Sequence, residues 1–201
     1  NDDAIECFGG AVNLKHIIFI STLDDDFDTD NGWSGKVQFG IVVRDSSVAD
    51  ISKSESFESD NDANGSALFP QTNGVYSNIT VIGPRQALTN IGNSLFLAGA
   101  QIRRNSTISI FNSVIMGYPT GLIIDASKGT PTDNNIRANT LLVQNTLIAG
   151  CNTPLSYAAS ATPTGWTTDS VSNWFLTPAY GNGILTTNDE VMLTDPYNYG
   201  N

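Results

Sequence analysis

The sequence predicts an all-β domain, a right-handed parallel β-helix (β-solenoid) of about five or six turns. Three segments carry one pattern of Asn, two residues, an aliphatic residue, one residue and Gly, namely SNITVIG (77–83), FNSVIMG (111–117) and QNTLIAG (144–150). The three segments begin 34 and 33 residues apart. Repeats of about this length, with short strands and variable loops, are typical of solenoids. A β-sandwich also has short strands, but it does not explain why the same register recurs three times.

Two earlier segments, 13–20 (NLKHIIFI) and 36–43 (KVQFGIVV), share alternating apolar positions 23 residues apart and predict two more turns. Stacking all five segments predicts an inner aliphatic ladder through Ile18, Ile41, Val81, Ile115 and Ile148. His16 falls on the apolar side of this pattern, which favours a core histidine over a catalytic one.

The whole chain, 1–201, is interpreted as one β-helix domain and as a piece of a longer protein, because it begins inside a motif. Clear repeats cover 1–150, and large loops are expected near 46–72 and 118–135. The segment 151–201 is rich in turn residues and is expected to be an irregular loop or cap.

An acidic motif belongs to the same repeat. Three apolar–acidic pairs, Ile5-Glu6, Phe27-Asp28 and Phe57-Glu58, follow one another at intervals of 22 and 30 residues. Because side chains alternate across a strand, the apolar member should point into the core and the acid outward. The sequence therefore predicts a column of Glu6, Asp28 and Glu58, with Asp30 beside Asp60.

Charge is distributed unevenly along the chain. Of a net charge of −11, residues 1–62 carry −10, because they hold 14 of the 20 acids and 4 of the 9 bases. This distribution disfavours nucleic acid as a partner, since phosphate binding needs a basic face. There is no apolar run of about 18 residues that predicts a membrane span. The two cysteines, Cys7 and Cys151, are too few for a disulfide framework and are expected to be free.

Stacked carboxylates repel one another unless they are neutralised, and hard oxygen ligands in this number suit Ca²⁺. Zinc is disfavoured by the single histidine, and an EF-hand is excluded because its twelfth position would fall on Val37 or Gln71. The alternative is that these acids cap backbone amides in turns. The residues predicted to bind calcium are Glu6, Asp26, Asp28, Asp30, Glu58, Asp60 and Asp62.

The stretch DDAIECFGGAVNLKHIIF, followed by DDDFDTDNGWSGKVQFGIVV, resembles secreted bacterial right-handed β-helix proteins of the Bacteroidetes type. In those proteins a DDG-E-FGG-V-K turn precedes a DD-D-D-GW-GK-Q turn, although Ala4 replaces the first Gly here. RRNSTISIFNSVIMGYPTGLIID is similar to their later arginine-then-asparagine turns. The resemblance covers roughly residues 1–150. It implies a secreted or cell-surface location without a firm activity.

Together these observations favour an exported β-helix module, structural or binding a glycan or a surface protein partner, over a catalyst. Trp33 is the candidate for stacking on a sugar ring. Later aromatic residues (Trp166, Trp174, Phe175 and Tyr180) are interpreted mainly as loop anchors.

The alternative function is a calcium-dependent lyase acting on acidic polysaccharide. Lys15 and Lys36 would be its candidate bases, followed by Arg104 or Arg137. The competing interpretation pairs the lysines with the stacked acids and leaves Arg104 above Arg137 as an exposed ladder.

Overall fold

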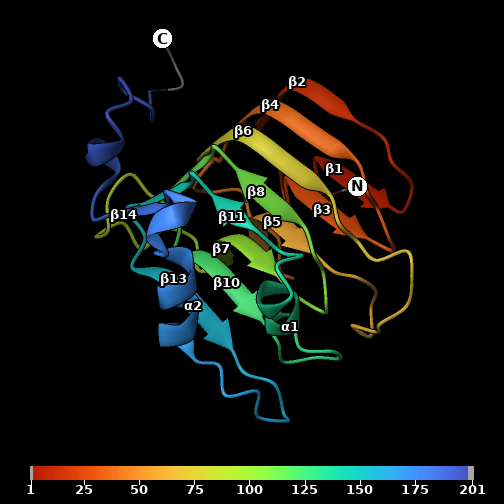
Figure 1. The fold of residues 1–201 in the computed structure, drawn as a ribbon. Coiled ribbons are helices and arrows are strands. Elements are labelled where there is room, and N and C mark those ends of the chain that lie inside the picture. The colour runs from red at the N-terminus through yellow and green to blue at the C-terminus, as the bar shows by residue number, and fades with distance from the viewer. Residues whose placement is uncertain (1, 199–201) are drawn as a thin grey trace.

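The computed structural model describes residues 2–198 and confirms the predicted parallel β-helix (Figure 1). Each turn contributes one strand to a six-stranded sheet, here called sheet A, in which every neighbouring pair is parallel. Its strands, in spatial and sequence order, are β1 (Ile5–Phe8), β3 (Phe27–Asp30), β5 (Ser54–Ser59), β7 (Phe96–Ile102), β10 (Thr120–Asp125) and β13 (Thr153–Ala158).

The facing sheet, here called sheet B, completes each turn and is also parallel throughout. Three early turns supply single long strands, and the next two turns each supply two short strands that meet at a bend. The strands of sheet B are β2 (Leu14–Ile20), β4 (Lys36–Val43), β6 (Val75–Ile82), β8 (Ser109–Phe111), β9 (Val114–Met116), β11 (Val143–Gln144), β12 (Leu147–Ala149) and β14 (Gly183–Leu185).

A column of left-handed residues bends sheet B at one place on every turn. Its members are His16, Phe39, Asn78, Asn112 and Asn145, with φ angles of 56°, 64°, 58°, 50° and 51°. Asn tolerates this conformation better than most residues, which explains the spacing of the repeated asparagines. The prediction of a core histidine is wrong, because His16 occupies the exposed bend and stacks on Phe39 with 5.1 Å between ring centroids.

The inner ladder of sheet B runs through Val42, Val81, Ile115 and Ile148, all at most 2 % exposed and paired in register. The predicted ladder is therefore correct at its last three positions. It is wrong at Ile18 and Ile41, which pair with each other and lie on the outer face, 64 % and 45 % exposed.

Strands occur where loops were expected. β5 lies within 46–72 and β10 within 118–135. The segment 151–201 contributes a strand to each sheet, β13 and β14, and Ile184 of β14 continues the ladder beside Ile148.

The remaining elements are short helices: α1 (Asp133–Arg137), α2 (Thr168–Phe175), and the 3₁₀ turns η1 (Pro178–Tyr180) and η2 (Asn188–Val191). Helix α2 packs beside β13 (Figure 1), at the end of the β-helix opposite β1. Cys7 and Cys151 are free, as expected, and both are buried. Within residues 2–198, no helix is long and apolar enough to cross a membrane.

Candidate functional site: the acidic face of sheet A

A column of carboxylates stands on the outer face of the first three strands of sheet A. Glu6 pairs in register with Asp28, and Asp28 with Glu58, as the sequence predicts. The next position of the column is Gln101, whose Nε2 donates to Oδ2 of Asp125 at 2.9 Å. The acidic column therefore ends after three turns and gives way to a neutral amide.

A second group of acids lies where these strands begin, and sequence reasoning did not assign it. Asp3 Oδ1 accepts from the backbone N of Asp25 at 2.9 Å, and Asp25 Oδ1 accepts from the backbone N of Glu55 at 2.7 Å. The available signal was their position beside the apolar–acidic pairs, in the runs LDDDF and SESFES.

Members of the column and of the second group combine into two compact sets of potential ligands. Carboxylate oxygens of Asp25, Glu55 and Glu58, here called the inner trio, lie within 4.8 Å of one another. Those of Asp3, Glu6 and Asp28, here called the outer trio, do the same. Glu6 is exposed, so the outer trio reaches the surface, whereas the inner trio is largely closed to solvent.

Burial makes ionisation of the carboxylates of the inner trio unfavourable. Asp25 is 3 % and Glu55 1 % exposed, and Oε2 of Glu55 is buried without a hydrogen-bond partner. Burial first, and then the negative charge of neighbouring carboxylates, raises the pKa of both groups above the ordinary range. Two such carboxylates are ionised together only if a cation neutralises them; otherwise they retain a proton.

The pKa values of the third member of the inner trio and of two members of the outer trio are raised as well. Burial, followed by the charges of Glu58 and Asp3, raises the pKa of Asp28 to about 8. Burial also raises the pKa of Glu58 to about 7, although Arg103 counteracts part of this effect. The pKa of Asp3 rises to about 6, mainly through burial. The acidic face therefore holds several protons, or a cation, near neutral pH.

Arginines neutralise the column at its Glu58 end. Arg103 Nε donates to Asp60 Oδ1 at 2.7 Å, and its Nη2 contacts Glu58. Arg104 pairs with the same Asp60. Arg137 pairs instead with Asp133 at 2.8 Å, so it does not share a partner with Arg104. Sequence reasoning singled out Arg104 and missed Arg103, which makes the more extensive contact.

Four residues of the predicted calcium set have other partners. Asp26 is 0 % exposed and forms an interior ion pair with Arg44. Asp62 caps the turn that follows it, accepting from the backbone N of Asn64 at 2.8 Å and from the Ser66 hydroxyl. Asp60 is held by the two arginines. Asp30 also follows the turn-capping alternative, because its Oδ1 accepts from the backbone N of Asn31 at 2.6 Å.

The structure places Trp33 in the core, so it offers no ring to a sugar. Its side chain is 0 % exposed and packs on Tyr76, with 5.7 Å between centroids. A Cβ at Gly74 would lie 1.8 Å from Cζ3 of the indole, so the chain passes directly over the ring. Trp174 and Phe175 are likewise buried, as expected for loop anchors.

Lys15 and Lys36 lie on β2 and β4, and both are exposed. These strands belong to sheet B, whereas the acidic column stands on sheet A. The structure therefore does not bring the two lysines together with the acids on one face.

Comparison with known proteins gives one match. A family model described as a pectate-lyase-like beta helix domain matches residues 1–187. No curated protein and no solved structure matches the chain. The finer resemblance to secreted Bacteroidetes-type proteins stays a prediction. With almost the whole chain matched by the model, this protein belongs to the family of pectate-lyase-like β-helix domains.

Proposed function

We propose that this chain is an exported module of the cell surface or extracellular space that binds an acidic glycan through calcium held on the acidic face of sheet A. The observation that carries the proposal is the inner trio, where Glu55 Oε2 is buried without a partner beside two further carboxylates. Membership of a pectate-lyase-like family supports a polysaccharide-related role.

The donor set fits calcium. Ca²⁺ takes six to eight hard oxygen ligands in flexible geometry, and the inner and outer trios offer carboxylate oxygens only. The inner trio would hold an ion that stabilises the fold. An ion on the outer trio keeps a solvent side, because Glu6 is exposed, and a uronate carboxylate is a suitable ligand there. Of the residues predicted from sequence, Glu6, Asp28 and Glu58 belong to these trios.

A calcium-dependent polysaccharide lyase is the second candidate, favoured by the arginines beside the column. A lyase base must give up its own proton before it can accept one. Burial of Arg103 lowers its pKa, but the hydrogen bonds to Asp60 and the charge of Glu58 outweigh this effect and raise it above its ordinary value. Arg103 is therefore a poor base, which supports binding over catalysis.

The test is binding of the chain to immobilised polygalacturonate and alginate, in calcium and in chelator. We expect calcium-dependent retention that is lost in the double variant Asp3→Asn, Asp28→Asn. Asp169→Asn, an exposed acid on α2, is the matched control and should be retained. Retention that persists in chelator would contradict the proposal. Accumulation of unsaturated product, followed by ultraviolet absorbance, would establish the lyase instead.

A further inference from the structure

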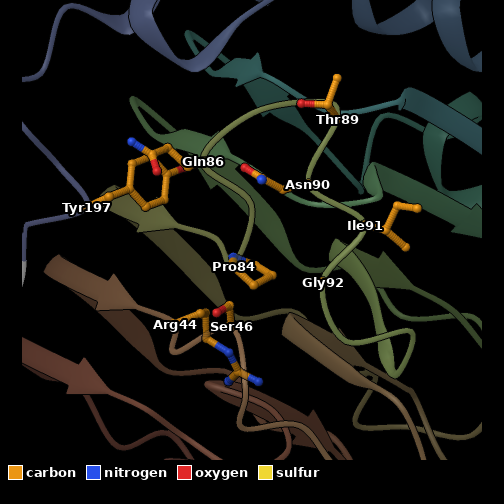
Figure 2. A pocket seen from close by; sticks show the side chains of 9 residues that line it. All are labelled: Arg44, Ser46, Pro84, Gln86, Thr89, Asn90, Ile91, Gly92 and Tyr197. Carbon is orange, nitrogen blue, oxygen red and sulfur yellow. The ribbon is translucent and has the colours of Figure 1, made fainter.

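A cavity of about 560 Å³ lies outside the acidic face, where two successive turns lead from sheet B back to sheet A (Figure 2). One wall comes from Ser46, which follows β4, and another from the loop 84–92, which follows β6. Tyr197, from the C-terminal segment, closes a third side. None of the acids of the inner or outer trio lines this cavity.

The loop that forms the cavity is held by hydrogen bonds at its start and at its tip. Asn188 donates from Nδ2 to the carbonyl oxygens of Arg85 and Gln86 at 2.7 and 2.9 Å. The Tyr197 hydroxyl donates to the same Arg85 carbonyl at 2.9 Å. At the tip, Asn90 Oδ1 accepts from the backbone N of Ala87 at 2.8 Å. The cavity wall is therefore built by specific contacts before any ligand arrives.

Several polar groups of the lining have no partner in the described part of the chain. They are the Ser46 and Thr89 hydroxyls, the Gln86 side-chain amide, and Nδ2 of Asn90, whose Oδ1 is already used within the loop. In Figure 2 the Asn90 amide extends from its loop toward Gln86 and Tyr197. These are neutral, directional donors and acceptors beside an aromatic ring.

Among residues 2–198, the cavity lining presents no free charge to a ligand. Arg44 is the one charged residue among the lining residues that the structure describes, and Figure 2 shows its guanidinium extending away from the other lining side chains. Nη1 and Nη2 of that guanidinium donate to Asp26 and to the backbone carbonyl of Asp24, at 3.1 and 2.7 Å, and its Nε is buried without a hydrogen-bond partner. A ligand that depends on ion pairing, such as a uronate or a phosphate, therefore lacks a partner here.

We propose that this cavity binds a neutral carbohydrate, of one to a few sugar rings. Hydroxyl-rich, uncharged ligands match amide and hydroxyl groups, and the apolar face of a sugar ring matches the side of an aromatic residue. The volume falls within the range of about 300–1,000 Å³ that is usual for small-molecule sites. This site needs no calcium, so it stands independently of the acidic-glycan proposal.

The test is calorimetric titration with four neutral disaccharides (cellobiose, maltose, mannobiose and diacetylchitobiose) in the presence of chelator. We expect saturable binding of at least one. Asn90→Asp keeps the oxygen that caps Ala87 but removes the amide donor, and should weaken binding by about tenfold or more. Thr89→Val removes one hydroxyl at nearly constant shape and should also weaken it.

Thr162→Val, on an exposed loop outside the cavity, is the matched control and should bind like the parent chain. Unchanged thermal midpoints in the two cavity variants show that the fold is intact. Absence of binding to all four sugars, or binding that neither cavity variant weakens, would overturn the proposal. Calcium-dependent retention on polygalacturonate reports on the acidic face, so the two proposals can fail separately.

Discussion

Asp26 and Arg44 form an ion pair closed to solvent, with 3.1 Å between Oδ1 and Nη1 and both side chains 0 % exposed. Asp26 Oδ2 also accepts from the Ser56 hydroxyl at 2.7 Å, which in turn lies 2.8 Å from the Tyr118 hydroxyl. The Arg44 guanidinium lies 5.2 Å from the ring centroid of Phe96. This network ties the end of β4 to the turn before β3 and to strand β5, and it separates Asp26 from the acids outside.

Breaking this pair from one side should destabilise the fold strongly. Asp26→Ala leaves the Arg44 guanidinium buried without its carboxylate, and we expect a loss of about 3–5 kcal/mol in the free energy of unfolding, measured in urea. Replacing both residues, as Asp26→Leu with Arg44→Met, should recover most of that loss. Lys128→Ala, at an exposed position, is the control. A loss below about 1 kcal/mol for Asp26→Ala would contradict the role given to the pair.

Asp28 has an acidic neighbour on both sides, so its substitution reports on what neutralises the column. In chelator, Asp28→Asn removes repulsion and should raise the thermal midpoint. In millimolar calcium the parent chain should gain more than the variant, because an ion that binds only the folded state stabilises it. Asp169→Asn should respond to calcium like the parent. If calcium leaves the parent midpoint unchanged, the acidic face is neutralised by protons.

Stability in chelator should fall as the pH rises from about 4 to about 8. The pKa values of Asp28, Glu58 and Asp3 lie at about 8, 7 and 6 in the folded chain, above their ordinary values. The folded state therefore keeps protons that the unfolded state releases in this range, and their stabilisation is lost as the pH passes each folded value. The pKa values of Asp45 and Asp62 are lowered, so the stability that these two carboxylates contribute is lost only at pH values below this range.

Thermal melts across this range, with chelator and with calcium, measure the effect. Calcium should flatten the decline, because the ion stabilises the ionised carboxylates that a rising pH produces. Asp28→Asn should show a shallower decline in chelator, since it removes the group that titrates highest among these three. Stability that rises between pH 6 and pH 8 in chelator would show that the acids are ionised and paired in the fold.

The parallel β-helix and the acidic column could be predicted because both depend on spacing along the chain. On the first two turns it was harder to predict which side chains point into the core and which point outward. The left-handed bend interrupts the simple alternation of side chains, and it is marked by Asn on later turns but by His16 and Phe39 here. Without that mark, Ile18 and Ile41 were aligned one position away from the true ladder.

The candidate site was predicted in outline for a similar reason. Stacking of Glu6, Asp28 and Glu58 follows from the repeat, whereas the partners of Asp26 and Asp60 come from distant loops. Arg44 and Arg103 lie 18 and 43 residues away from those acids, in positions that no local pattern identifies. Trp33 follows an acidic turn and suggested exposure, but the chain at Gly74 covers its ring.

The left-handed column itself can be tested at Asn112, which is exposed and has a φ of 50°. A β-branched residue is strained in this conformation, so Asn112→Val should cost about 1–2 kcal/mol in the free energy of unfolding. Asn112→Gly should cost much less, because glycine adopts positive φ freely and the one side-chain hydrogen bond of Asn112 within residues 2–198 is long, at 3.5 Å to Ser77. Asn173→Ala, on the exposed face of α2, is the control and should be neutral or slightly stabilising. Equal losses for Val and Gly at 112 would mean that the amide contact, not the backbone conformation, explains why Asn recurs on the later turns.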